Sequence, residues 1–213
     1  MNTQVLIIGG GVTGTGIARD LALRGVECIL AERRDLNTGA SGGNHGLLHS
    51  GARYIVSDPS SARECQRENR LLKRLAAHCI EDCGGLFVAV KGDDENYVAD
   101  FSALCARQEI PVERLAPSEA AEIEPVLSPN VIAAYRVNDA SVDPFKLSIE
   151  NIAHAQEFGA VFLPHRQVVG FDCRNGRICR VHLQDTRSGR KSAVAAEQVI
   201  SACGAWAGDI AAL

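Results

Sequence analysis

The chain has 213 residues, of which 46% are hydrophobic and 23% charged, a composition typical of a globular protein. Its formal net charge of −4 argues against a protein with a broad nucleic-acid-binding surface. No apolar run approaches the ~20 residues of a membrane span, and the apolar N-terminus lacks the basic flank of a signal peptide. The eight cysteines include no C-x-x-C pair, so we expect reduced thiols, no metal site and a cytoplasmic location.

The N-terminal segment has the pattern of a dinucleotide-binding turn. It predicts a buried strand, a glycine turn, a helix and a second strand, over residues 5–8, 9–11, 12–24 and 26–31. Gly9 permits the tight turn, Gly11 lets the backbone approach a pyrophosphate, and Gly14 allows the helix to pack closely on the strand. Gly25 suits the residue just after the helix. Glu32 follows the second strand, where a carboxylate would accept hydrogen bonds from ribose hydroxyls.

Residues 33–56 do not continue as a plain nicotinamide-binding domain would, with another regular helix and strand. The stretch is long, irregular and rich in Gly, Ser and Asn, and such segments inside compact domains are usually functional. Its small residues at 39–43 suit backbone contacts with an extended ligand. The polar and aromatic side chains near them are Asn44, His45, His49, Arg53 and Tyr54.

The rest of the chain predicts both helices and strands. The expected helices cover residues 58–80, 96–108, 117–124 and 144–159, and the expected strands cover 86–90, 131–137, 160–163, 166–172, 177–185 and 193–201. In the first of these helices the apolar residues share one face, which we expect to be buried: Cys65, Leu72, Leu75, Ala76 and Cys79. A capping box of Ser61 and Glu64 would lie at its start.

The order of elements predicts an α/β fold, with a Rossmann-like βαβ domain for FAD or NAD(P) and an inserted α+β substrate-domain portion. We place the first part of the FAD-binding domain at 1–84, the insertion at 85–142 and the second part at 143–213. The apolar strand 193–201 leads into small residues at 202–208. Because ligands of open α/β sheets bind beyond the carboxyl ends of strands, this turn would bring a second backbone segment to the same cofactor, which favours a flavoprotein.

Four segments carry a resemblance to a known family: residues 8–25, 44–54, 142–147 and 200–208. The first of them matches beyond its generic glycines. The chain resembles the FAD-dependent glycerol-3-phosphate dehydrogenases, which belong to the glycine oxidase/D-amino-acid oxidase-like flavoproteins. Within that family the likeness is greatest to the large catalytic chain of the anaerobic bacterial enzymes, and it extends over the whole sequence.

The resemblance implies a set of site residues. Those expected to contact FAD are Gly9, Gly11, Gly14, Glu32, Arg33, Ala40, Ser41, Asn44, His45, Gly46, Leu47, Val168 and Gly204. Those expected near the flavin and substrate are Arg53, Tyr54, His49 and His45. A planar guanidinium such as that of Arg53 suits a substrate phosphate. His45 and His49 are equal candidates for the base, and a structural hydrogen bond is an equal alternative for either.

The resemblance also implies a reaction and partners. The reaction would be oxidation of sn-glycerol 3-phosphate to dihydroxyacetone phosphate, with hydride transfer to flavin and electrons passed to a quinone through partner subunits. The same partners would supply any peripheral association with the inner membrane.

Two other functions stay open at this point: a related FAD-dependent amino-acid or 2-hydroxy-acid oxidoreductase, and a noncatalytic FAD-binding fragment. Members of the family are much longer than this chain. We therefore expect a fragment of a longer protein or a truncated gene product.

Overall fold

The computed structural model describes all 213 residues, which form two compact units. The first unit comprises residues 1–45 and 143–213, and the second comprises 46–142. The sequence analysis placed its boundaries after residues 84 and 142. Residues 46–84, which the sequence analysis assigned to the FAD-binding domain, pack instead with 85–142, because their helix and short strands bury their side chains there.

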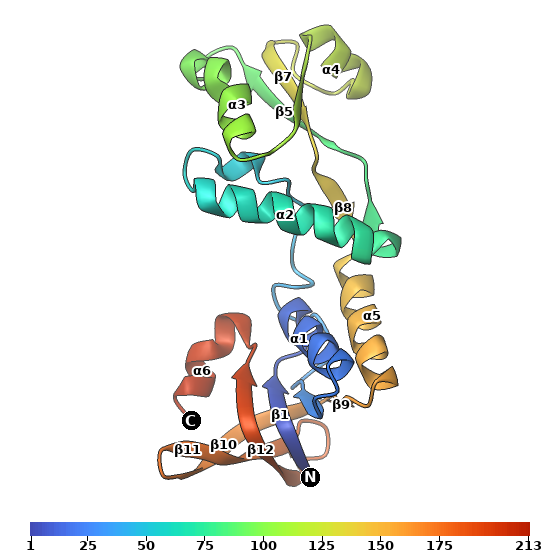
Figure 1. Ribbon diagram of the computed structural model, residues 1–213, viewed down its shortest axis with the longest axis vertical. Helices are drawn as coiled ribbons and strands as arrows, with labels where there is room; N and C mark the ends of the chain where they lie inside the picture. The colour runs from blue at the N-terminus through green and yellow to red at the C-terminus, as the bar shows by residue number, and fades with distance from the viewer. The chain divides into compact units, whose positions relative to one another are not determined.

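The first unit is built on one mixed six-stranded sheet. Its strands are, in spatial order, β10 (Arg166–Arg174), β11 (Arg177–Asp185), β12 (Lys191–Ser201), β1 (Asn2–Ile8), β2 (Cys28–Ala31) and β9 (Val161–Leu163). Strands β12, β1, β2 and β9 are parallel, whereas β10, β11 and β12 are antiparallel (Figure 1). The carboxyl ends of the parallel strands therefore meet at one edge of the sheet, where ligands of such folds bind.

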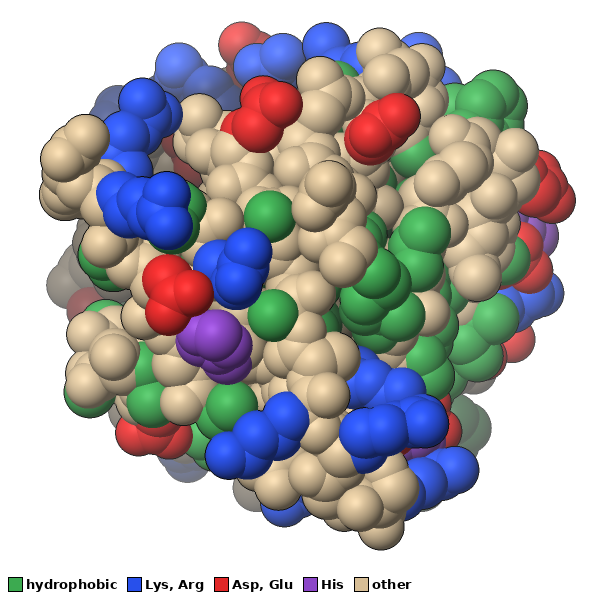
Figure 2. Space-filling model, turned by 90° about the horizontal axis from the view of Figure 1, so that it is seen from below, with side chains coloured by type: hydrophobic (Ala, Val, Ile, Leu, Met, Phe, Trp, Pro, Cys, Tyr) green, Lys and Arg blue, Asp and Glu red, His purple; other side chains and the backbone are tan.

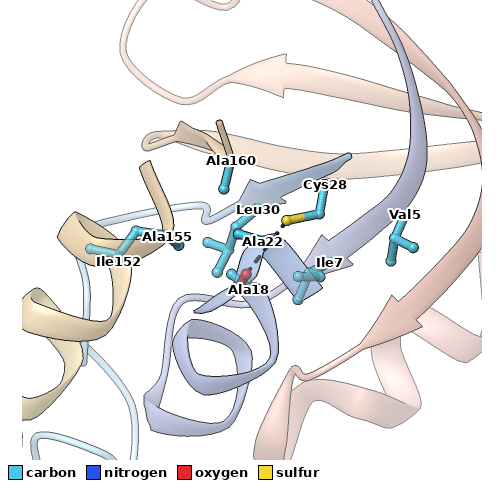
Figure 3. Close-up of a cluster of buried hydrophobic side chains, with 9 residues drawn as sticks. All are labelled: Val5, Ile7, Ala18, Ala22, Cys28, Leu30, Ile152, Ala155 and Ala160. Atoms are coloured by element: carbon cyan, nitrogen blue, oxygen red, sulfur yellow. Dashed lines mark hydrogen bonds between the residues drawn. The ribbon is translucent and has the colours of Figure 1, made fainter. Parts of the chain in front are cut away.

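The two faces of this sheet are both buried, as expected for central parallel strands. Val5 and Ile7 of β1 face α1 (Val12–Leu23) and α5 (Pro144–Glu157), whose small and aliphatic side chains complete the cluster in Figure 3. Leu6 and Ile8 point to the other face, into a cluster with the strands β10 to β12. Full burial of a large aliphatic side chain stabilises the fold by about 1.5–3 kcal/mol.

Local sequence signals explain the caps and turns of the first unit. Gly25 has φ +74° just after α1, as its C′ position requires. Asp143 caps α5 by accepting hydrogen bonds from the backbone N–H groups of Phe145 and Lys146. The hairpin from β10 to β11 turns at Asn175 and Gly176, both with positive φ, as a type I′ turn demands.

The second unit contains two small antiparallel sheets and three helices. One sheet consists of β5 (Gly85–Val90), β7 (Val131–Val137) and β6 (Val112–Leu115), and the other of β3 (Leu47–Leu48), β8 (Ala140–Val142) and β4 (Ile80–Glu81). The helices are α2 (Pro59–Leu75), α3 (Glu95–Arg107) and α4 (Pro117–Ile123). Phe101 and Cys105 of α3 are buried against Tyr135 of β7, and Ala120 of α4 packs on Ala134. The sequence analysis missed β3, β4, β6 and β8, because strands of two to four residues show no usable periodicity.

Helix α2 differs from the expectation in length, cap and buried face. It ends at Leu75 and is followed by a 3₁₀ turn at Ala77–Cys79. Its cap is Asp58, whose carboxylate accepts from the Ser61 N–H, rather than a Ser61–Glu64 box. The expected apolar face is wrong at Leu75, which is 59% exposed, whereas Ala76 and Cys79 of that face are buried.

The buried face of α2 is instead Ala62, Gln66 and Asn69. Asn69 donates through Nδ2 to the carbonyl oxygens of Leu48 and Asn138, at 3.1 and 3.0 Å. Gln66, with its amide assigned so that both ends are satisfied, donates to the Ser50 carbonyl at 3.0 Å. Buried polar groups must be paired, and here the irregular chain around 48–50 supplies the partners.

The surface carries both charge signs. On the face that Figure 2 views, basic and acidic side chains are interspersed, with hydrophobic side chains exposed between them. No helix of the protein combines the length and the apolar character needed to cross a bilayer.

Candidate cofactor site

The first unit contains a pocket of about 540 Å³ beyond the carboxyl ends of β1, β2 and β12. Its walls come from four segments distant in the sequence: the glycine turn, the loop after Glu32, the start of β10 and the end of the chain from Ser201. The lining is mainly backbone and small side chains, which suits a flat, extended ligand held by hydrogen bonds to the main chain.

The glycine turn can be formed only by glycine at two of its positions. A Cβ on Gly9, whose φ is +112°, would lie 2.5 Å from the Ala202 carbonyl oxygen. A Cβ on Gly14 would lie 1.9 Å from the Gly9 carbonyl oxygen. Backbone occupies both spaces, so α1 starts directly against the turn. Its N-terminus lies at the pocket wall, where the Val12 N–H donates to Ser41 Oγ at 3.0 Å.

The Glu32 carboxylate is buried at the end of β2, with 9% exposure. Its Oε2 accepts from the Gly10 N–H at 2.7 Å, and its Oε1 accepts from the Arg34 N–H at 2.8 Å. Each oxygen keeps a further lone pair. Glu32 therefore fixes the glycine turn while still able to accept a hydroxyl from a ligand in the pocket.

Trp206, the only tryptophan of the chain, forms part of the pocket wall. The Arg33 guanidinium lies 4.3 Å from the centre of its ring, in a cation–π contact. On another side the ring lies against Gly39, where an added Cβ would come within 2.9 Å of it. Trp206 thus ties the C-terminal segment to the loop after β2.

Eight of the residues expected to contact the cofactor line this pocket: Gly9, Gly11, Glu32, Arg33, Ala40, Ser41, Val168 and Gly204. Gly14 lies behind the turn and packs helix against strand. Asn44 and His45 belong to the first unit but not to the pocket wall, and Gly46 and Leu47 belong to the second unit. Contact of all these residues with FAD stays a prediction.

Several lining residues were missed in the sequence. Those with side chains in position to contact a ligand include Thr13, Gln167, Cys203, Trp206 and Asp209. The tryptophan could have been found, because the segment 200–208 that contains it was among those that carried the family resemblance.

The second unit brings His49, Ser50 and Asp139 together. Nδ1 of His49 lies 3.6 Å from Oδ2 of Asp139, and Oδ1 of Asp139 accepts from the Ser50 N–H at 2.6 Å. The His49 ring meets that of Tyr54 edge to face, with centroids 6.3 Å apart. The Ser50 N–H thus fixes the Asp139 carboxylate beside the His49 imidazole.

Gly51 places the next residues of this segment. Its φ is +94°, and a Cβ there would lie 2.1 Å from the Ala62 carbonyl oxygen on α2. The following 3₁₀ turn, Ala52–Tyr54, carries Arg53 exposed to solvent and Tyr54 half-buried. His49, Arg53 and Tyr54 therefore lie within one short segment whose turn only glycine can form.

The cysteines are all free. Burial raises the pKa of the Cys28 thiol and raises that of Cys105 to about 11. Both thiols are protonated at neutral pH and act as small core side chains, as the sequence indicated. No group of three or more His, Cys, Asp or Glu side chains is placed to hold a metal ion.

Residues 4–213 match the model of one protein family, described as DAO, FAD dependent oxidoreductase. The chain therefore belongs to the FAD-dependent oxidoreductase family. Members of this family depend on FAD, which is the cofactor that the sequence analysis expected.

Among curated relatives, the chain is 47% identical over 210 residues to the A component of the anaerobic glycerol-3-phosphate dehydrogenase of Escherichia coli K12, a protein named as one of that enzyme's subunits. The match covers 99% of this chain but 39% of that protein. This chain thus spans about two fifths of the length of that relative.

Two solved structures agree with the fold. The L-proline dehydrogenase of P. horikoshii has a TM-score of 0.85 and 27% identity, over 99% of this chain and 55% of that one. The glycerol-3-phosphate dehydrogenase of Bacillus halodurans, solved with FAD, has a TM-score of 0.74 and 24% identity, over 98% of this chain and 36% of that one. The α/β FAD-binding fold expected from the sequence is confirmed.

Proposed function

We propose that this chain is the FAD-binding part of a dehydrogenase that oxidises sn-glycerol 3-phosphate to dihydroxyacetone phosphate. The observation that carries the proposal is the 47% identity, over almost the whole chain, to a relative named for that activity. L-proline dehydrogenase, whose fold is similar, shares 27%. Since one fold serves many substrates, the sequence match is the stronger guide to the substrate.

The pocket of the first unit fits FAD. Gly9, Gly11 and Thr13, at the turn and the start of α1, line the pocket, so a pyrophosphate would approach the backbone there without meeting a large side chain. Glu32 would accept the ribose hydroxyls, and the pocket continues past Val168, whose backbone would contact adenine. FAD, when bound, supplies the hydride acceptor, and the protein supplies orientation and electrostatics.

We assign the general base to His49 rather than His45. His49 has Asp139 at 3.6 Å, itself held by the Ser50 N–H, whereas His45 is exposed at the boundary of the first unit. Its role would be to take the proton of the substrate hydroxyl while hydride leaves the same carbon. Arg53, exposed and only four residues from His49, would bind the substrate phosphate.

The relative is named as one subunit of its enzyme, which supports a complex in which partner proteins accept the electrons and pass them to a quinone. A location at the inner membrane through those partners, with this chain on the cytoplasmic side, belongs to the same proposal.

The deciding experiment is an anaerobic visible spectrum of the purified chain, before and after addition of sn-glycerol 3-phosphate. Loss of the flavin absorbance supports the proposal. Reduction only by amino acids or 2-hydroxy acids would replace it with the related oxidoreductase. Bound flavin that no candidate substrate reduces would indicate FAD binding without catalysis by these 213 residues.

Binding of the cofactor has its own readout. Because Trp206 is the only tryptophan and lines the pocket, FAD binding should quench its fluorescence saturably. FMN, which lacks the adenosine, should quench it far more weakly. Equal quenching by both would show that the adenosine half of the pocket is not used.

A further inference from the structure

A second hollow, of about 580 Å³, lies next to the cofactor pocket in the first unit. We call it the arginine hollow and define it by the residues that carry its charge: Arg33, Arg34, Asp35, His165 and Arg187. Arg33 lines the cofactor pocket too, as do Thr38 and Gln167, so the two spaces share a wall. Nothing in the proposed reaction uses the arginine hollow.

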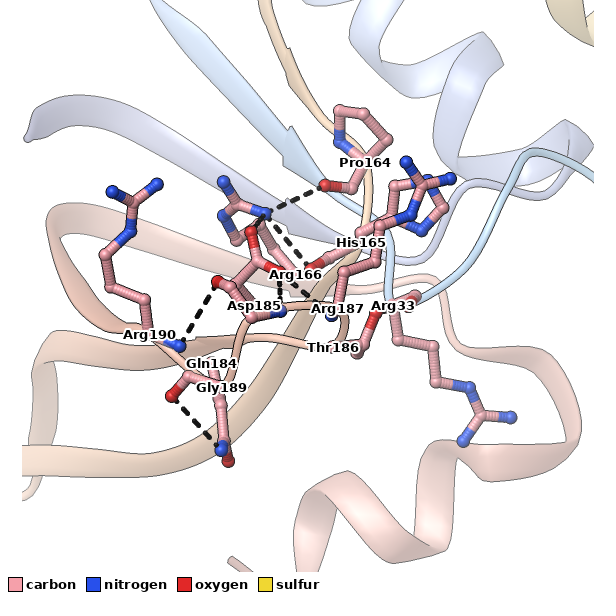
Figure 4. Close-up of polar contacts among 11 residues, drawn as sticks. Arg33, Pro164, His165, Arg166, Gln184, Asp185, Thr186, Arg187, Gly189 and Arg190 are labelled. Atoms are coloured by element: carbon pink, nitrogen blue, oxygen red, sulfur yellow. Dashed lines mark hydrogen bonds and ion pairs between the residues drawn. The ribbon is translucent and has the colours of Figure 1, made fainter.

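The hollow stands on a hydrogen-bonded frame, shown in Figure 4. The His165 N–H donates to the Arg34 carbonyl at 3.2 Å. The Thr186 N–H donates to the His165 carbonyl at 3.0 Å. The Thr186 hydroxyl donates to the Arg33 carbonyl at 3.1 Å. The loop after β2, the β9–β10 connection and the β11–β12 turn are therefore fixed to one another. The backbone that carries the side chains of the arginine hollow is therefore held in place.

The charge of this region is unevenly compensated. Asp185 forms an ion pair with Arg166 at 2.5 Å and also accepts the N–H groups of Arg187 and Ser188. These contacts hold the pKa of Asp185 down, at about 2, with its backbone hydrogen bonds as the first cause. The carboxylate that neutralises Arg166 is thus fully committed and is not available to the arginines of the hollow.

The guanidiniums of the hollow are not paired with carboxylates. Arg34 and Arg187 are exposed and take part in no salt bridge, and Arg33 is occupied only on the face that stacks on Trp206. Asp35 is the one carboxylate in the wall, and its Oδ1 accepts from the Leu36 N–H at 2.8 Å. Three guanidiniums against one carboxylate form a local positive site in a chain of net charge −4.

We propose that the arginine hollow binds the phosphate group of a small ligand beside the adenosine end of the cofactor pocket. A guanidinium offers paired N–H donors that match phosphate oxygens, and several of them around one hollow suit a dianion better than a single carboxylate. The N–H donors of Arg34 and Arg187 are open to a ligand from solvent, since no carboxylate holds them. The ligand would be free phosphate or a phosphate monoester.

The test is a calorimetric titration of the 213-residue chain, in saturating FAD, with sodium phosphate at an ionic strength held constant with sodium chloride. Glycerol 2-phosphate is titrated in parallel. Equal affinities for phosphate and for glycerol 2-phosphate would show that the hollow recognises the phosphate group alone. A higher affinity for glycerol 2-phosphate would show that it is a site for a phosphate monoester. Arg34→Gln and Arg187→Gln change only the arginine hollow, because neither residue lines the cofactor pocket. Each should weaken binding by roughly two- to fivefold, as loss of an exposed ion pair does.

Two further variants sharpen the test. Asp35→Asn removes the opposing charge while keeping an acceptor for the Leu36 N–H, and it should tighten phosphate binding. Arg190→Gln removes an exposed arginine from the same turn but outside the hollow, and it should leave the affinity unchanged. No saturable binding above the chloride background would overturn the proposal. An equal loss in Arg190→Gln and Arg187→Gln would do the same, because it would show general charge screening.

Discussion

The irregular loops of the two units differ in how many polar side chains hold their backbone. In the first unit the turn at 9–14 is shaped by the absence of side chains, since backbone oxygens lie where Cβ atoms would be. In the second unit the chain at 48–50 is held by side chains, with Asn69 and Gln66 of α2 and Asp139 each bonded to its backbone. Both loops need glycine, at Gly9 and Gly14 in the first unit and at Gly51 in the second. The second loop depends in addition on three polar side chains, whereas Glu32 bonds to the first.

The largest effect is expected from Gly14→Ala. The new methyl group would stand 1.9 Å from the Gly9 carbonyl oxygen, and backbone cannot move aside without opening the turn. We expect a loss of about 3 kcal/mol or more in the free energy of unfolding, the upper range for overpacking, together with loss of FAD binding. Urea denaturation and Trp206 fluorescence measure the two effects.

Gly16→Ala is the matched control on the same helix, because nothing lies within 4 Å of its Cβ position. Alanine is the better helix former by about 0.5–1 kcal/mol, so this variant should be more stable than the parent. Equal destabilisation by both substitutions would contradict a steric cause at the turn.

Asn69→Ala tests whether a buried polar side chain of α2 holds the loop of the second unit. It removes the Asn69 donor from the Leu48 and Asn138 carbonyls, of which Asn138 keeps the Lys73 ammonium as a donor. We expect the free energy of unfolding to fall by about 1–3 kcal/mol. Arg67→Ala, on the exposed face of the same helix, should change it by less than about 0.5 kcal/mol. If the two variants unfold at the same urea concentration, the buried amide does not hold the loop.

Asp139→Asn separates positioning from folding in the proposed site. An asparagine oxygen can still accept from the Ser50 N–H, so the loop should keep its stability while the carboxylate beside His49 is lost. We expect the rate of flavin reduction by glycerol 3-phosphate to fall by roughly 10- to 100-fold, part of what a general base contributes. KM should stay unchanged. A change in KM alone would assign Asp139 to substrate binding.

A smaller effect is expected from the cap of α5. Asp143→Ala removes the acceptor for two N–H groups and should cost about 1 kcal/mol of stability. Asp143→Asn should restore most of it, because asparagine caps helices nearly as well. Thermal unfolding of the two variants measures the difference, and equal melting temperatures would show that the cap is not needed.

The smallest effect is a dependence on pH in the first unit. The pKa of Asp185 is lowered from 3.8 to about 2 by its bonds to the turn at 187–188, so the unfolded chain binds this proton more readily. Its contribution to stability is complete above pH 4 and is lost as the pH falls towards 2. In Asp185→Asn the urea midpoint should change less with pH between pH 4 and 2 than it does in the parent chain.

Some local features of the fold could be predicted from the sequence, and others could not. The glycine turn, Glu32, the caps at Gly25 and Asp143 and the turn at Asn175 were all predictable, because each is fixed by the conformation of a few adjacent residues. The face of α2 was not. Leu75 is exposed and Asn69 buried because the partner of this helix is an irregular loop that presents carbonyl oxygens.

The sequence by itself determined the α/β class, the dinucleotide turn and the family, since these depend on local backbone chemistry and on motifs that are contiguous. Tertiary structure decided which distant segments meet. It brought Trp206 against Gly39 and Arg33, Asp139 beside His49, and Arg187 next to Arg34. Such pairs lie far apart along the chain, and their contacts follow from the register of strands and the packing of helices, which no short pattern of residues encodes.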